Sequence, residues 1–321
     1  MPSPQLIIIV IATYNGEKYL AQQLESIVSQ TIPSAFKLKL LFSDDGSSDK
    51  TVDIIEAARQ KFSHIEMVIK KNPLRMGPAM NFYMAVSAAF DLGADFISLS
   101  DQDDFWLPMK LTKALQVLNG TLGPALYMGS ASVVNENLQI ISRIPGLGTK
   151  TSFPSLLLSN QRAGMTFVFN REAATLLFKH PEPATIVMHD WWFELVLCLS
   201  EAQIFEDDEQ LVLYRQHETN AIGVYSSYLG KIKAGYKRAV RNFSIRSAQA
   251  NAIGRINIGD CQSKAFMVGA LIETIPHSFP ALLQILISKD FFANRRGFQK
   301  VEARILLVIS YSLYHARKEF N

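Results

Sequence analysis

The feature that most constrains the fold is a regular alternation of strand-like and helix-like segments in the first 119 residues. The run QLIIIVIAT at 5–13 is continuously apolar and rich in β-branched residues, which is typical of a strand buried on both faces. The segment EKYLAQQLESIVSQ at 17–30 has apolar residues at helical spacing. Further strands are expected at 38–45, 65–70 and 94–100, and further helices at 48–62, 77–93 and 107–119. Because the links are short, the pattern predicts an α/β fold with a mostly parallel sheet covered by helices on both faces.

Charge divides the chain into two parts. Residues 1–225 hold 17 Lys and Arg against 24 Asp and Glu, whereas residues 226–321 hold 15 against 5. A change of this size favours a domain boundary near residue 225. We therefore predict a catalytic domain at 1–225 and a basic, mainly helical domain at 226–321. The acidic run EDDE at 206–209 is typical of a solvated turn.

Cysteine content and hydropathy point to a cytoplasmic protein. Cys198 and Cys261 both lie in apolar sequence, which favours a reducing compartment over a disulfide framework. No uninterrupted apolar run reaches about 18 residues, so no membrane-spanning helix is predicted. The run LIIIVIA at 6–12 lacks a preceding basic segment and a following cleavage site, which favours a buried strand over a signal peptide. We expect no nucleic-acid partner.

An acidic cluster follows the expected strand at 94–100. The stretch LSDQDDFW places Asp101, Asp103 and Asp104 where that strand ends. Ligands of open α/β sheets bind at the carboxyl ends of the strands. Carboxylates crowded together repel one another unless a cation lies between them, and Mg²⁺ or Mn²⁺ suits such oxygen ligands. Capping of the next helix is the simpler alternative, but it does not require three carboxylates.

Other polar residues end the neighbouring strands and complete this edge of the sheet. They are Thr13, Tyr14, Asn15, Asp44 and Asp45. The turn ATYNGEKYL after the first strand contains neither G-x-G-x-x-G nor G-x-x-x-x-G-K-[ST], which disfavours dinucleotide and P-loop sites.

Several motifs in register resemble a known family. The segments IATYNGEKYLAQQLESIVSQT, LFSDDGSSDKT, NPLRMGPAMNF and LSDQDDFW occur in this order, and together they resemble family 2 glycosyltransferases. Further on, MHDWWFELV (188–196) and LVLYRQHETNAIG (211–223) are similar to the rhamnosyltransferase branch of bacterial O-antigen and capsule clusters. The resemblance covers about residues 5–225 and implies a GT-A fold, which is Rossmann-like.

The resemblance implies roles for residues that would bind the nucleotide sugar. Asp44, or else Asp45, would accept a hydrogen bond from the base, with Thr13 and Tyr14 beside it. A turn with a helix cap explains the same segment, and Asn15 fits a turn as well as a contact. Arg75 would meet a phosphate and Asn81 the ribose or the loop, unless they are a solvated arginine and a helix-surface asparagine.

The stretch Asp101-Gln102-Asp103 resembles the D-x-D motif of the family. Asp103 would bind the metal, and Asp101 the ribose or the metal through water. Within YRQHETN, His217 would be a second metal ligand, because imidazole also suits Mn²⁺. Arg215 would neutralise the diphosphate, and the alternative is a surface arginine.

Asp190 in HDWW occupies the place of the acidic general base of the family. Its alternative is a cap on the expected helix at 191–199, and both can hold. The resemblance also implies an acceptor site, for which the candidates are Gly164, Met165, His189, Trp191 and Trp192, although core packing explains an aromatic pair equally well.

The resulting hypothesis is an inverting, Mn²⁺- or Mg²⁺-dependent glycosyltransferase acting on a saccharide or lipid-linked acceptor. The donor would be dTDP-L-rhamnose, with a UDP-hexose as the alternative. A sugar nucleotidyltransferase would need a glycine-rich basic loop that TYNGEKY lacks, and a non-catalytic polysaccharide-binding protein would not need the intact set of candidate site residues.

The last part of the chain carries basic clusters at 231–246 and 293–300 between apolar stretches. Basic residues near an anionic leaflet are worth about 1 kcal/mol each. We therefore expect peripheral attachment to the inner face of the cell membrane. The alternative is an ordinary helical domain whose basic face is solvated.

Overall fold

A computed structural model describes residues 3–144, 153–158, 160, 162–179, 186–217 and 286–287. The strands are β1 (Gln5–Thr13), β2 (Phe36–Asp44), β3 (Glu66–Lys71), β4 (Phe96–Ser100), β5 (Phe105–Trp106), β6 (Ala125–Val134), β7 (Ile140–Arg143), β8 (Phe167–Asn170) and β9 (Gln203–Arg215). The helices are α1 (Leu20–Val28), α2 (Thr51–Lys61), α3 (Pro78–Asp91), α4 (Lys110–Leu118), α5 (Phe153–Leu158), α6 (Arg171–Phe178) and α7 (His189–Leu199), with a 3₁₀ turn, η1 (Gly164–Thr166).

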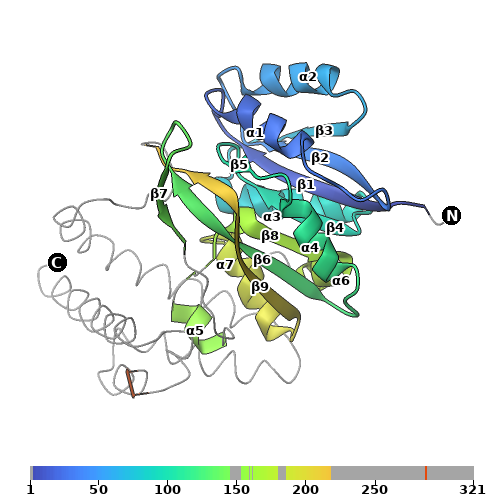
Figure 1. The fold of residues 1–321 in the computed structure, drawn as a ribbon, viewed down its shortest axis with the longest axis vertical. Coiled ribbons are helices and arrows are strands. Elements are labelled where there is room, and N and C mark those ends of the chain that lie inside the picture. The colour runs from blue at the N-terminus through green and yellow to red at the C-terminus, as the bar shows by residue number, and fades with distance from the viewer. Residues whose placement is uncertain are drawn as a thin grey trace, which may run out of the picture.

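The described strands form one sheet with a parallel half and a mixed half (Figure 1). Its order is β3-β2-β1-β4-β8-β6-β9-β5, and β7 pairs with β6. Strands β3, β2, β1 and β4 are parallel, as are β6 and β9, whereas β8 is antiparallel to both of its neighbours. The predicted α/β fold with a mostly parallel sheet and flanking helices is confirmed.

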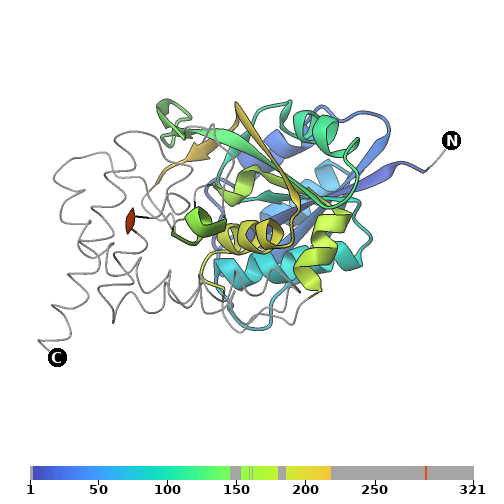
Figure 2. The same ribbon diagram turned by 90° about the horizontal axis from the view of Figure 1, so that it is seen from below.

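Strand β1 is continuously apolar because each of its faces is covered by helices. Ile7 and Ile9 pack with residues of α1, α2 and α4, whereas Ile8 and Val10 pack with residues of α3, α6 and α7. Figure 2 shows the two groups of helices on opposite sides of the sheet. Alternate side chains of a strand point to opposite faces, so one apolar run contributes to both cores.

The carboxyl ends of β1, β2 and β4 lie side by side at the edge of the sheet where the polar candidate residues were expected. Thr13 at the end of β1 is in register with Asp44 at the end of β2, and Ile11 pairs with Ser100 at the end of β4. Strand β5 then pairs antiparallel with the last part of β9, Phe105 with Leu213. The loop between β4 and β5 therefore lies beside the residues that follow β9.

The expected turn at 206–209 is wrong, because these residues belong to β9. The strand pairs with β6 on both sides of an irregularity, with Glu206 opposite Met128 and Gln210 opposite Ser130. Within this bulge Asp207 accepts a 2.8 Å hydrogen bond from the Tyr127 hydroxyl. A bulge lets acidic side chains interrupt the apolar pattern without ending the strand.

The predicted basic domain at 226–321 lies outside the described residues, apart from 286–287, so its boundary stays a prediction. Among the helices in the described ranges, none is both long and apolar enough to cross a membrane.

The two-sided burial of β1 predicts a large loss of stability on truncation. Ile9→Ala should lower the free energy of unfolding by about 2–5 kcal/mol, because Ile9 is fully buried. Ile140→Ala is the matched control, since Ile140 is 59% exposed and should change stability by less than about 0.5 kcal/mol. Urea unfolding of both variants measures the difference. Equal effects would contradict the packing described for β1.

Candidate active site

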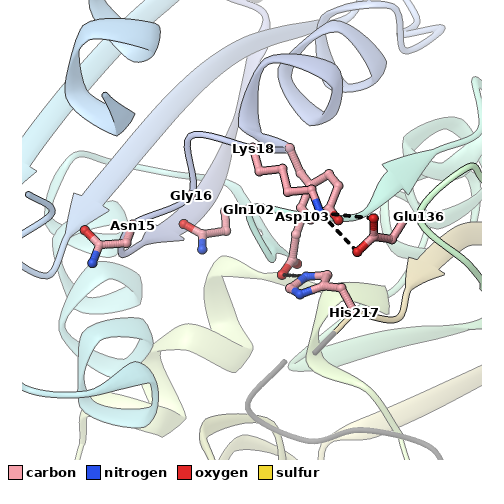
Figure 3. Close-up of a pocket in the computed structure, with 8 residues that line it drawn as sticks. Asn15, Gly16, Lys18, Gln102, Asp103, Glu136 and His217 are labelled. Carbon is pink, nitrogen blue, oxygen red and sulfur yellow. Dashed lines mark hydrogen bonds and ion pairs between the residues drawn. The ribbon is translucent and has the colours of Figure 1, made fainter. Parts of the chain in front are cut away.

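A cavity of about 250 Å³ opens at the edge of the sheet. It lies where the loop after β1 faces the loop after β4 and the residues after β9 (Figure 3). Its lining residues are Asn15, Gly16, Lys18, Tyr19, Gln102, Asp103, Glu136 and His217.

Asp103 and His217 meet in this cavity. The Nε2 atom of His217 lies 2.9 Å from Oδ2 of Asp103, and the side chains are 8% and 16% exposed. The imidazole ring packs against Tyr19, with 4.9 Å between the ring centroids. The structure thus brings together the two side chains that the sequence assigned to the metal, although they are 114 positions apart.

Asp101 lies in the electrostatic field of other carboxylates. Burial, and then the charges of Asp103 and Asp190, together raise the pKa of Asp101 to about 8. Asp101 does not join Asp103 and His217 in one group, since the described ranges contain no set of three or more His, Cys, Asp or Glu side chains placed to hold a metal ion. Crowded carboxylates of this kind are nevertheless stabilised in their ionised form by a nearby cation.

Arg215 is neither a surface arginine nor open to the cavity. It is 1% exposed, its Nε donates to the Asp103 carbonyl at 2.9 Å, and its Nη2 donates to Oε1 of Gln22 at 2.5 Å. Its Nη1 contacts the Glu136 carbonyl, and its backbone N–H donates to Oδ1 of the buried Asp104 at 3.1 Å. The guanidinium therefore holds the loop that carries Asp103, which corrects its expected place at a diphosphate.

Gln102 connects the loop between β4 and β5 to the loop after β1. Its Oε1 accepts from the Tyr14 N–H at 2.9 Å, and its Nε2 donates to the Tyr14 carbonyl at 3.0 Å. A Cβ atom at Gly16 would lie 2.3 Å from Oε1 of Gln102, so a larger residue here would displace the Gln102 side chain from the Tyr14 backbone. Asn15 has a φ of 47° and accepts from the Ser48 N–H at 2.9 Å, as a turn residue does.

Asp44 and Asp45 are buried and bonded to groups of the protein. Asp44 accepts from the hydroxyl of Thr13 at 3.0 Å and from the N–H of Ser47 at 3.0 Å. Asp45 accepts from the N–H groups of Met76 and Gly77 at 2.9 and 2.8 Å. In this structure the two carboxylates shape the loops around the expected base site.

The two other expected nucleotide contacts differ in exposure. Asn81 is buried, so it is not a helix-surface residue. Its Oδ1 accepts from the Ser43 hydroxyl at 2.6 Å and from Nδ2 of Asn72 at 2.9 Å, and its Nδ2 donates to the Ser43 carbonyl at 2.9 Å, so it bonds to the end of β2 and to the loop after β3. Arg75 is exposed, and its guanidinium lies 3.8 Å from the centre of the Tyr14 ring. Arg75 and Tyr14 can therefore both reach a ligand at this edge.

Asp190 lies in the first turn of α7 against the turn η1. Its Oδ2 accepts from the Gly164 N–H at 3.2 Å, and its Oδ1 accepts from the Trp191 N–H at 2.7 Å. A Cβ atom at Gly164 would lie 2.6 Å from Nε2 of His189, so glycine is needed here. The His189 ring stacks on Phe82 at 3.9 Å, and burial lowers the pKa of this imidazole.

Three of the expected acceptor contacts belong to the core instead. Trp191 and Trp192 are both buried, and the indole N–H of Trp191 donates to the Leu156 carbonyl at 2.6 Å. Met165 is buried among residues packed on the other face of the sheet. No ring face of this pair is open to a sugar, because the helix that carries them is buried on nearly all sides.

Comparison with known proteins decides the family. The model of the family described as "Glycosyl transferase family 2" matches residues 8–169, half of the chain. The chain belongs to this family. A dTDP-rhamnosyl transferase, RfbG, from Shigella flexneri is 28% identical over 72% of this chain and 79% of its own length. An uncharacterized glycosyltransferase from Haemophilus influenzae is 27% identical over 75% of this chain and 87% of its own length.

Solved structures of other glycosyltransferases share the fold. Residues 1–349 of S. aureus TarS align with a TM-score of 0.55 and 16% identity over 99% of this chain and 92% of that one. A mannosyltransferase from Pyrobaculum calidifontis, in complex with GDP-Man and Mn²⁺, aligns with a TM-score of 0.52 and 15% identity over 97% of this chain and 86% of that one. The expected GT-A architecture is confirmed for this family 2 glycosyltransferase, and a sugar nucleotidyltransferase is disfavoured.

Sequence reasoning missed two charged residues of the glycosyltransferase cavity. The ammonium of Lys18 lies 3.0 Å from both carboxylate oxygens of Glu136. Figure 3 marks this pair with dashed lines. Lys18 is the only basic residue in the turn after β1, which could have singled it out. Glu136 lies in the turn between β6 and β7 and carries no sequence signal.

A further carboxylate lies one helical turn beyond Asp190. Glu194 is fully buried, and neither of its oxygens has a hydrogen-bond partner in the described structure. Burial, and then the charges of Asp190 and Glu206, raise the pKa of Glu194 to about 8 against the opposing charge of Arg162. Burial, and then the charge of Glu194, raise the pKa of the Cys198 thiol.

The buried Glu194 predicts a pH-dependent stability. Its pKa is raised from 4.5 to about 8, so the folded protein keeps a proton that the unfolded chain releases, and stability falls as pH rises through this window. Glu194→Gln should remove a slope of up to about 1.4 kcal/mol per pH unit. Urea unfolding at pH 5 and pH 8 measures it, with the exposed Glu172→Gln as control. Parallel curves for wild type and Glu194→Gln would contradict the assignment.

Proposed function

We propose that this chain is an inverting glycosyltransferase that moves a sugar from a nucleoside-diphosphate donor to a saccharide or lipid-linked acceptor. Its product would be a cell-surface polysaccharide such as an O-antigen or a capsule. The observation that carries the proposal is the contact between Asp103 and His217. The charges of both Asp103 and Asp190 raise the pKa of Asp101, which links this contact to Asp190. A candidate metal and phosphate site and a candidate base thus share one edge of the sheet.

Asp103 and His217 would hold Mn²⁺ or Mg²⁺, and Asp101 would reach the ribose, or the ion through a water molecule. Their carboxylate and imidazole groups suit such an ion, and the crowding of Asp101 by Asp103 favours a cation here. The ion would supply Lewis-acid stabilisation of the charge on the departing nucleoside diphosphate. The structural likeness to a mannosyltransferase in complex with Mn²⁺ supports this assignment.

Asp190 would act as the general base. Its carboxylate takes the proton of the acceptor hydroxyl, whose oxygen forms a bond to the anomeric carbon while the bond from that carbon to the diphosphate oxygen breaks. The electron pair of that bond leaves with the diphosphate, and the configuration inverts. The N–H groups of Gly164 and Trp191 fix the carboxylate for this step. Lys18 would meet the diphosphate in place of the buried Arg215.

The proposed donor is dTDP-L-rhamnose, supported by the relative named as a dTDP-rhamnosyl transferase. A UDP-hexose is the second candidate, supported by the likeness to TarS residues 1–349 in complex with UDP, at a TM-score of 0.53 and 14% identity. Peripheral contact with an anionic membrane stays a prediction, supported by the basic composition of 226–321.

The donor and the metal can be tested together. Transfer from a panel of nucleotide sugars should be fastest with dTDP-L-rhamnose in the presence of Mn²⁺ and should be lost in EDTA. Asp103→Ala should weaken both Mn²⁺ and dTDP binding, because it removes a ligand of the shared site. Turnover of no donor would contradict the proposed activity, and full activity of Asp103→Ala in EDTA would contradict the metal site.

The base assignment predicts a separation of binding from chemistry. Asp190→Asn should lower the transfer rate by about 100-fold or more, because a positioned base contributes at least that much. The dissociation constant for dTDP should stay within about twofold, because the substitution removes a proton acceptor and conserves the shape of the side chain. A collapse of dTDP affinity with a near-normal residual rate would instead make Asp190 a structural helix cap.

A further inference from the structure

Arg162, Glu194 and Glu206 form a largely buried cluster of charged side chains next to Asp190. Arg162 precedes η1, Glu194 lies on α7 and Glu206 lies on β9, so three separate segments contribute. Arg162 is almost fully buried, and its Nη2 contacts Oε2 of Glu206 in an ion pair. Glu194 is near enough for its pKa to respond to both partners.

The cluster is incompletely satisfied within the described structure. The Nε and Nη1 atoms of Arg162 have no hydrogen-bond acceptor, and both oxygens of Glu194 lack a donor. Buried polar atoms without partners are costly, and apolar residues of similar volume would often serve packing better. The cluster is therefore poorly explained as a device for stability alone.

Two members of this cluster belong to the segments that hold Asp190. Arg162 lies two residues before Gly164, whose N–H donates to Asp190 at 3.2 Å. Glu194 lies four residues after Asp190, on the same side of α7. A Cβ atom at Gly164 would approach Cβ of Asp190 to 3.0 Å, so η1 packs closely against the first turn of α7.

We propose that Arg162 is a positioning residue for Asp190. Through Glu206 it fixes the segment 162–164 to β9, and this segment places the Gly164 N–H on the Asp190 carboxylate. The inference rests on the proposed function, because the position of Asp190 matters for transfer only if Asp190 is the base.

The test compares Arg162→Met and Arg162→Lys with a matched control. Lys113→Met breaks the pair between Lys113 and Glu209, which joins another segment to the same strand β9 at a more exposed place. Arg162→Met should lower kcat by about 10- to 100-fold, since small displacements of a catalytic group have effects of this size. Its dissociation constant for dTDP with Mn²⁺ should stay within about twofold of the wild-type value, because Arg162 does not line the cavity. Arg162→Lys should recover part of kcat, and Lys113→Met should match the wild type.

Two kinetic outcomes would overturn the proposal. One is a folded Arg162→Met protein with wild-type kcat. The other is an equal loss of dTDP affinity and kcat without rescue by lysine, which indicates a general structural role. If Arg162→Met does not fold, Glu206→Gln takes its place, because it weakens the same ion pair. It should lower kcat while the dissociation constant for dTDP stays within about twofold, and a wild-type kcat in this variant overturns the proposal.

A structural readout separates this inference from the proposed function. If the wild-type protein transfers no sugar, the proposed activity fails. Crystal structures of the wild type and Arg162→Met then decide the geometric claim. A displaced 162–166 turn that no longer bonds Asp190 supports positioning by Arg162, and an unchanged contact between Gly164 and Asp190 overturns it.

Discussion

The candidate site depends on the short antiparallel pairing between β5 and β9. Only two residues of β5 take part, with Phe105 opposite Leu213 and Trp106 opposite Val212. The pairing places the acidic loop before β5 beside the residues after β9, and Arg215 then bonds the Asp103 carbonyl. Asp103 and His217 meet as a consequence. The rest of the sheet supplies a rigid edge from which both segments extend.

The fold could be predicted because its signals are local. The apolar run at 5–13 coincides with β1, and helical spacing located α1 to α4 within a few residues of their ends. Residues 206–209 could not be assigned in this way. Their place in β9 is decided by pairing with β6, which is distant in sequence, and a bulge hides the alternation that marks a strand.

The candidate site could be predicted in part. Motif order indicated that Asp103, His217 and Asp190 belong to one site, but it carries no information on which way a side chain points. Burial placed Arg215 and Asn81 in supporting roles, and it placed Trp191 and Trp192 in the core. Lys18 and Glu136 were missed because their pairing joins two turns that are 118 positions apart.

The turn that carries Glu136 has a consequence for how substrate preference can change. Residues 135–139 are closed by their own hydrogen bonds, and every residue of β7 beyond them is exposed. Insertions in such a hairpin disturb little of the core, whereas a single insertion in β1 would exchange its two buried faces. Changes in the length of this loop can therefore reshape one wall of the cavity with little effect on the core, provided that the Glu136 carbonyl keeps its contact with Arg215.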